Sequence, residues 1–252
     1  MRLLNLGCGT KTSDCPGVVN IDWSLYLRIR QNPVLRLCAL PLLSAERREK
    51  LSRIPSNVMV FNLARGIPFP AGSVDAVYHS HLLEHLDRDV APLFIREIKR
   101  VLKPAGIMRV VVPDFEYLCR EYLGSLERAA RASQYAKNHD EYVGAVLEQC
   151  VRKMGKGTAA QNAVRRWIEK VVLGDARRRG ETHQWMYDRV NLVELLGTAG
   201  FERVSVMDYQ TSNIPRWADY RLDLTDKGDE YKPHSLYVEA HAPSGKRQAG
   251  DR

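Results

Sequence analysis

The chain has 252 residues, of which 44% are hydrophobic and 27% are charged, and its formal net charge is +8. This length suits one α/β domain with a modest insertion, and the composition is that of a globular protein. No apolar run is long enough to cross a bilayer, and the first residues lack the features of a secretory signal, so we expect a cytoplasmic protein. The five cysteines contain no Cys-x-x-Cys pair, which disfavours a zinc ribbon or a disulfide framework. The basic balance favours anionic partners without identifying one.

Short apolar runs alternate along the chain with stretches of helical periodicity, which is typical of a parallel sheet covered by helices. The apolar spacing predicts helices at Val90–Leu102 and Val190–Thr198, and Lys103-Pro104-Ala105-Gly106 should end the first of them. In chain order, the predicted strands are Arg2–Leu6, Val18–Asp22, Val58–Phe61, Val74–His79, Gly106–Val112, Arg203–Asp208 and Ser235–His241.

The pattern divides the chain into a core and an insertion. Residues 1–114 and 181–241 form the predicted core, whereas residues 115–180 break the alternation and indicate helices alone. An insertion after the fifth strand would lie at the carboxyl edge of the sheet, so we interpret it as a lid or substrate-recognition unit, with a helical decoration as the alternative. Residues 242–252 have the composition of a disordered tail.

One segment between the second and third strands, Tyr26–Leu43, mixes leucines with arginines. Such a mixture could meet a membrane surface. Pro33 and Pro41 break any long amphipathic helix, however, which favours a segment that covers the sheet. We therefore expect no membrane contact.

The first strand runs directly into Gly7-Cys8-Gly9, and the second ends in Asp22. Glycines at this point allow a tight turn, and a carboxylate after the second strand can accept both hydroxyls of a ribose. Thr12 stands where a dinucleotide fingerprint would need a third glycine, and the ending of a P-loop is missing too, which disfavours a pyrophosphate site. The alternatives are that the two glycines only form a turn and that Asp22 only ends its strand. Only eight residues separate Gly9 from Val18, which leaves no room for a helix between the first two strands.

Longer runs carry a resemblance to a known family. LNLGCGTK, GVVNID, FNLARGIPFPAGSVDAVYHSHLLEHL and EIKRVLKPAGIMRVVVPD resemble class I S-adenosylmethionine-dependent methyltransferases of the type 11-like group. Within that group, and with GETHQWMYDRVNLVELLGTAGF and KPHSLYVEAH included, the chain resembles bacterial methyltransferases associated with polysaccharide biosynthesis. The resemblance implies a doubly wound, Rossmann-like α/β sheet of seven strands with strand seven antiparallel. It also implies S-adenosyl-L-methionine as the cofactor.

The same resemblance implies roles for individual residues. The glycine loop would line the methionine part of the cofactor, Asp22 would hold the ribose, and the residues after the fourth strand would face the sulfonium and the substrate. Asn62 stands where the family usually has an aspartate against the adenine amino group, and Lys11 replaces a small residue. The implied cofactor-binding residues are Asn5, Gly7, Cys8, Gly9, Asp22, Asn62, Leu63, His79, Ser80 and His81.

His81-Leu82-Leu83-Glu84-His85 also fits H-x-x-E-H, a motif of zinc peptidases in which two histidines and a glutamate share one site. Here the motif directly follows a buried strand, and no third ligand is evident downstream. We therefore predict no metal site, and interpret Glu84 and His85 as the start of the next helix.

Two residues are candidates for a general base. His183 lies where the insertion returns to the sheet, and Asp114 follows the fifth strand. Each also has a structural interpretation: His183 could belong to a packed hinge, and Asp114 could cap the following helix.

The predicted reaction is O-methylation of a sugar, a glycan or another small-molecule acceptor. RNA methylation is an alternative that the basic charge encourages, but no RNA-binding module and no aromatic–basic strip is evident, so we expect no nucleic-acid partner. A non-catalytic scaffold with a methyltransferase fold is the third hypothesis.

Overall fold

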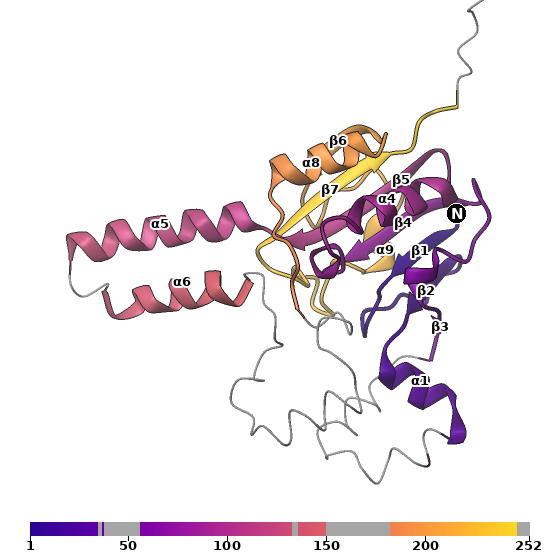
Figure 1. Cartoon of the computed structure of the whole chain (residues 1–252), viewed down its shortest axis with the longest axis horizontal. Coiled ribbons are helices and arrows are strands. Elements are labelled where there is room, and N and C mark those ends of the chain that lie inside the picture. The colour runs from indigo at the N-terminus through magenta and orange to yellow at the C-terminus, as the bar shows by residue number, and fades with distance from the viewer. Residues whose placement is uncertain (35–36, 38–55, 133–135, 150–181, 246–252) are drawn as a thin grey trace, which may run out of the picture.

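The computed structural model describes residues 1–34, 37, 56–132, 136–149 and 182–245 (Figure 1). Its strands are β1 (Leu3–Leu6), β2 (Val18–Asp22), β3 (Val58–Val60), β4 (Val74–Ser80), β5 (Leu102–Pro113), β6 (Glu202–Met207) and β7 (Ser235–His241). Its helices are α1 (Leu25–Gln31), α4 (Ala91–Val101), α5 (Phe115–Arg131), α6 (Ala136–Gln149), α8 (Arg189–Thr198) and α9 (Trp217–Tyr220), with short 3-10 turns η2 (Leu63–Arg65) and η3 (Leu83–His85).

All seven strands form one sheet in the order β3-β2-β1-β4-β5-β7-β6. Strands β1 to β5 pair in parallel, and β7 runs antiparallel to both β5 and β6. The predicted seven-stranded α/β sheet with an antiparallel seventh strand is therefore confirmed. The chain leaves β1 toward β2 and β3 and then crosses to β4 on the other side of β1. This reversal creates a switch point between β1 and β4, which is where open α/β sheets bind their ligands.

Both faces of the sheet are covered. On one face, apolar residues of α4 and α8, such as Ile95, Ile98 and Leu192, pack with Leu4 and Val110 of the strands. On the other face, Leu3, Tyr78 and Val111 pack with Trp217 and Tyr220 of α9. The strands read as nearly continuous apolar runs because a parallel sheet is buried on both faces.

The chain passes from β1 to β2 without a helix, as the short spacing predicted. Two buried asparagines organise this connection instead. Asn5 Nδ2 donates to Asn20 Oδ1 and to the Lys11 carbonyl, both at 2.9 Å. Asn20 Nδ2 in turn donates to the Ser13 carbonyl at 3.0 Å. Side-chain amides can bond to backbone groups that no helix satisfies, so the pair fixes the path of the loop.

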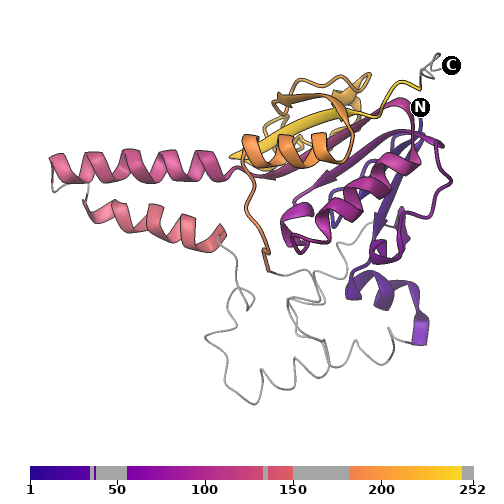
Figure 2. The ribbon, with the colours of Figure 1, turned by 45° about the horizontal axis from the view of Figure 1, so that its top comes forward.

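The insertion begins as a helical hairpin. Helix α5 leaves the end of β5 and extends away from the sheet, and α6 runs back beside it (Figures 1 and 2). These helices agree with the helical prediction for this region. Residues 150–181 lie outside the described residues, so the lid remains a prediction. Residues 246–252 of the predicted tail (242–252) and residues 35–36 and 38–43 of the segment 26–43 also lie outside them. No helix in the described part of the chain is long and apolar enough to span a membrane.

Candidate functional site

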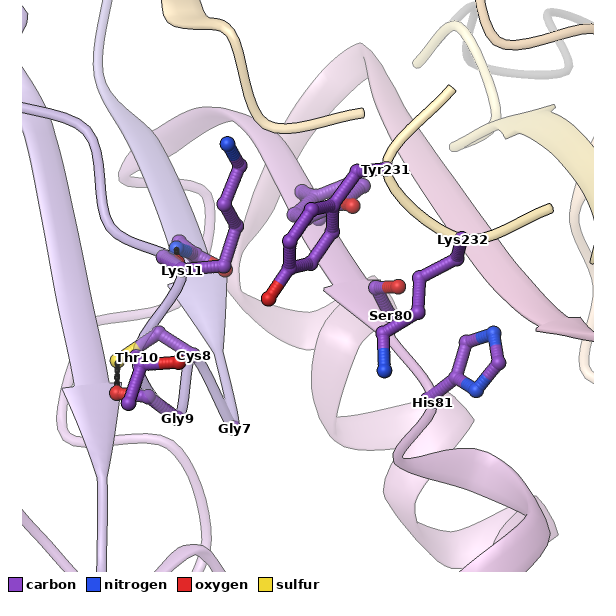
Figure 3. Close-up of a pocket in the computed structure, with 11 residues that line it drawn as sticks. Gly7, Cys8, Gly9, Thr10, Lys11, Ser80, His81, Tyr231 and Lys232 are labelled. Atoms are coloured by element: carbon purple, nitrogen blue, oxygen red, sulfur yellow. Dashed lines mark hydrogen bonds between the residues drawn. The ribbon is translucent and has the colours of Figure 1, made fainter. Parts of the chain in front are cut away.

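A cavity of about 210 Å³ opens at the carboxyl ends of β1 and β4. In Figure 3 the loop after β1 forms one wall, the end of β4 forms another, and Tyr231 and Lys232 enter from the connection before β7. The cavity therefore lies at the switch point of the sheet. Its lining residues are Asn5, Gly7, Cys8, Gly9, Thr10, Lys11, Tyr78, Ser80, His81, Tyr231 and Lys232.

The two glycines of the loop are needed for different reasons. Both have positive φ, +64° at Gly7 and +54° at Gly9, which L side chains rarely adopt. A Cβ on Gly7 would come within 3.0 Å of the Leu82 side chain. A Cβ on Gly9 would meet no described atom within 4 Å. Gly7 therefore allows close packing, whereas the backbone at Gly9 faces open space that a ligand can fill.

Asp22 is joined to this loop. The Gly9 N–H donates to Asp22 Oδ2 at 2.8 Å. Partial burial raises the pKa of Asp22, while backbone donors, Gly9 first among them, oppose the rise. Burial and the nearby Asp22 charge also raise the pKa of the Cys8 thiol to about 12. The thiol is therefore a neutral group in the wall, and the carboxylate stands beside the loop.

Asn62 and Leu63 lie next along the same sheet edge. The Phe61 N–H donates to the Asp22 carbonyl at 3.0 Å, which brings the end of β3 beside the end of β2. The Asn62 side chain caps η2 by accepting from the Ala64 N–H at 3.0 Å. Neither Asn62 nor Leu63 is among the residues that line the cavity described above. Their predicted adenine contacts would extend the site beyond that cavity.

The three residues at the end of β4 do not share one face. Tyr78 and Ser80 line the cavity, whereas the intervening His79 is fully buried, with its ring edge-on to Phe94 of α4. Both ring nitrogens of His79 lack a hydrogen-bond partner among the described residues, and burial lowers its pKa to about 3. Successive strand residues point to opposite faces. The structure therefore places His79 away from the cavity and brings Ser80 and His81 into it.

His81 follows β4 with a φ of +50°, an uncommon value for a residue other than glycine. Its Nε2 lies 2.9 Å from Ser235 Oγ, and its Nδ1 lies 3.5 Å from Glu84 Oε1. Burial, aided by Lys232 and nearby histidines, lowers the pKa of His81 to about 3. His81 is thus a neutral ring at neutral pH, held between the cavity and Glu84.

Behind His81 lies a cluster of Glu84, His85 and His183, each of which offers one ligand-type atom within 4.8 Å of the others. Burial raises the pKa of Glu84 to about 8 and lowers that of His85 to about 4. The segment after the insertion brings His183 here, because the Gln184 and Trp185 N–H groups donate to the Glu84 carbonyl at 2.6 and 3.3 Å. The downstream histidine that the sequence motif lacked is therefore His183, 98 residues after His85.

The two predicted general bases are engaged elsewhere. Asp114 caps α5 by accepting from the Tyr117 N–H at 3.2 Å, as its alternative interpretation expected. His183 Nδ1 lies 3.0 Å from the Gln149 carbonyl oxygen, and its ring contacts that of His85. Neither residue lines the cavity.

Five residues of the cavity wall were not among the predicted site residues: Thr10, Lys11, Tyr78, Tyr231 and Lys232. Lys11 Nζ donates to the Leu224 carbonyl at 2.6 Å and stands over the Tyr231 ring, 4.6 Å from its centroid. The Tyr231 N–H donates to the Asp223 carbonyl at 2.8 Å. Tyr231 and Lys232 belong to an irregular connection about 150 residues from β4. The run KPHSLYVEAH begins at Lys232, but its resemblance to the family implied no site role for either residue.

The chain has likenesses to known methyltransferases. A family model described as a methyltransferase domain matches residues 30–110, which follow the glycine loop. A methyltransferase from Thermotoga maritima, described as S-adenosylmethionine-dependent, is 16% identical with a TM-score of 0.42, covering 96% of this chain and 82% of that one. One from Archaeoglobus fulgidus is 12% identical with a TM-score of 0.40, covering 95% and 85%. No curated protein matches the sequence.

The chain thus contains a matched methyltransferase domain, and its strand order and its glycine loop with the following acid are those that the resemblance to class I S-adenosylmethionine-dependent methyltransferases implied. The protein is accordingly an enzyme, and its cofactor is S-adenosylmethionine. At identities of 12–16% and TM-scores near 0.4 the solved structures add no detail, so the acceptor has to be sought in the site itself.

Proposed function

We propose that this methyltransferase transfers the methyl group to an oxygen of a sugar, a glycan or a similar small molecule. The observation that carries the proposal is the position of the cavity, at the switch point between β1 and β4 beside the Gly9–Asp22 hydrogen bond. In open α/β sheets a nucleotide-like ligand binds at this position. The wall of the cavity opposite the glycine loop can then contact a second substrate.

The cofactor would lie along the β1 and β2 ends. Gly7, Cys8 and Gly9 would line its methionine part, and the open space at Gly9 suits that role. Asp22 would accept the ribose hydroxyls, with Asn62 and Leu63 beyond it at the adenine. When bound, the cofactor supplies an activated methyl group. The protein then has mainly to align the acceptor, because an in-line displacement depends on orientation.

The acceptor would lie against Ser80, His81, Tyr231 and Lys232. Figure 3 shows the Lys232 side chain reaching toward Ser80 inside the cavity. The bound cofactor would supply the methyl group, and the acceptor hydroxyl would have to lose its proton during the transfer. A nearby ammonium group stabilises the developing oxyanion, so the proton can pass to water. This arrangement assigns no base role to His183 or Asp114, since both side chains are engaged outside the cavity.

Calorimetric titration with S-adenosylmethionine and S-adenosylhomocysteine tests the cofactor site. Asp22→Ala removes a charged hydrogen-bond acceptor, so we expect affinity to fall about 10- to 100-fold. Asp140→Ala, which removes an exposed carboxylate on α6, is the matched control and should leave affinity unchanged. Equal affinities in Asp22→Ala and the wild type would contradict the proposed ribose contact.

Transfer of a labelled methyl group tests the acceptor. We expect label in sugar nucleotides or oligosaccharides and none in RNA. Lys232→Met should lower kcat/KM about 10- to 100-fold because the oxyanion loses its partner. Lys227→Met, an exposed lysine of the same connection, is the control. Label in RNA alone would replace the proposal with the RNA alternative.

A further inference from the structure

Glu84 is a buried carboxyl group whose surroundings the methyl-transfer site leaves unexplained. Its side chain is fully buried, and neither carboxyl oxygen has a hydrogen-bond partner among the described residues. Two imidazole nitrogens lie close to it: His81 Nδ1 at 3.5 Å and His85 Nε2 at 3.9 Å from Oε1. Burying a polar group without a partner costs free energy, so buried carboxylates are normally paired or bind a cation.

Two histidines of the cluster have their tautomers fixed by backbone carbonyls. His85 Nδ1 lies 3.3 Å from the Thr182 oxygen, and His183 Nδ1 lies 3.0 Å from the Gln149 oxygen. A carbonyl oxygen only accepts, so each Nδ1 is the donor and each Nε2 keeps its lone pair. Metal-binding histidines show this pattern, with the second ring nitrogen donating to a carbonyl or carboxylate.

The spacing of the cluster suits a small ion. One ligand-type atom from each of Glu84, His85 and His183 lies within 4.8 Å of the others. Ligands held about 2.0–2.2 Å from a divalent ion are about 3–4 Å apart, so the side chains would close by about an ångström. The hydrogen bonds from Gln184 and Trp185 to the Glu84 carbonyl hold the two contributing segments together.

We propose that Glu84, His85 and His183 form a binding site for one divalent transition-metal ion of the Zn²⁺, Co²⁺ or Mn²⁺ class. One carboxylate and two imidazoles suit these ions, whereas Ca²⁺ and Mg²⁺ prefer oxygen ligands throughout. The ion would balance the buried carboxylate. It would also fasten the segment after the insertion, which carries His183, to the turn that follows β4. The site stands apart from methyl transfer, because none of its three ligands lines the cofactor cavity.

The test is metal binding by the full-length protein. After chelator dialysis, the protein is titrated with Co²⁺, followed by the visible absorption of the bound ion, and with Zn²⁺, followed by elemental analysis. We expect one ion per chain, and a rise in the midpoint of thermal unfolding when Zn²⁺ is added. His183→Ala and Glu84→Gln should each weaken binding at least about 10-fold.

The controls separate this site from its neighbours. His139→Ala removes a histidine of α6 outside the cluster, and it should leave the metal affinity unchanged. His183 is half-buried, so His183→Ala gives a folded test protein even where Glu84→Gln does not. Cofactor affinity, measured in parallel, should be retained in His183→Ala. Less than one ion per chain in the wild type, or equal metal affinity in the wild type and His183→Ala, would overturn the proposal, whatever the outcome for methyl transfer.

Discussion

Two buried clusters of ionisable side chains in this protein differ in how many of their polar atoms are hydrogen-bonded. Arg109, on β5, bonds to Asp223 at 2.8 Å and to Glu239 at 2.9 Å, and it also donates to the carbonyls of Thr211 and Asp208. Asp223 accepts further from Tyr78 and Trp217. In the cluster around Glu84, by contrast, the carboxyl oxygens have no hydrogen-bond donor in the described part of the chain.

The difference separates two uses of buried ionisable groups. The Arg109 cluster holds the connection after β6 against the sheet, and through the Asp223 carbonyl it supports Tyr231 in the cavity wall. A fully bonded network of this kind makes a structure rigid. The Glu84 carboxyl oxygens make no hydrogen bond in the described part of the chain, so the free-energy cost of burying them is better explained by a ligand. Three changes would break or sharpen this comparison.

The largest effect is expected for Arg109→Met. The change leaves Asp223 and Glu239 buried without their cation, so the free energy of unfolding should fall by about 3–5 kcal/mol. Urea denaturation measures it. Arg120→Met is the matched control, since Arg120 is exposed and paired with Glu116 on α5, and it should cost less than about 1 kcal/mol. Equal losses in the two variants would contradict the structural role of Arg109.

A smaller effect concerns pH and His79. Its pKa is about 3 in the folded protein, below the 6.5 of a free histidine, because the ring is buried. The unfolded chain therefore binds a proton that the folded one does not, and stability is full above pH 6.5 and is lost as the pH falls toward 3. From pH 7 to pH 5 this histidine should therefore lower the free energy of unfolding by about 2 kcal/mol. In His79→Leu the decline should be smaller by that amount, as measured by urea denaturation at both pH values. An unchanged decline would show that His79 is solvated.

The smallest effect is expected for Glu84→Met in the presence of a chelator at pH 7. Methionine replaces a buried carboxyl group that has no hydrogen-bond donor among the described residues, so the free energy of unfolding should stay the same or rise by about 1–2 kcal/mol. Added Zn²⁺ should stabilise the wild type and not the variant. A loss of more than about 1 kcal/mol in chelator would mean that Glu84 belongs with the structural cluster.

Most of the fold could be predicted because buried parallel strands appear as apolar runs. The range of β7 was predicted as observed, and β1, β2 and β4 differ from their predictions by one residue or less. Strand β5 begins at Leu102 and not at Gly106. Residues 103–106 were expected only to end the preceding helix, but they belong to β5, where its pairing with β4 shifts register between Val74 and Ala76. A stop signal in sequence does not reveal such a register shift. The short helix α9 had no predicted counterpart.

The site was predictable only where neighbours in sequence are neighbours in space. The glycine loop and Asp22 follow adjacent strands, so their meeting could be inferred from the sequence. Strand alternation could also have separated His79 from Ser80. Lys232 and His183 reach the β4 end from distant connections. Tertiary packing alone brings them there, and local patterns do not encode it.

The cysteine in the glycine loop has a consequence for oxidative chemistry. With a pKa of about 12, Cys8 has a thiolate fraction on the order of 10⁻⁵ at pH 7, and the thiolate is the form that reacts with peroxides, disulfides and alkylating agents. A cysteine of low pKa in this loop would be open to oxidation. Cys8 is instead a small apolar wall residue, and the loop should retain its shape under oxidants that inactivate enzymes with exposed thiolates.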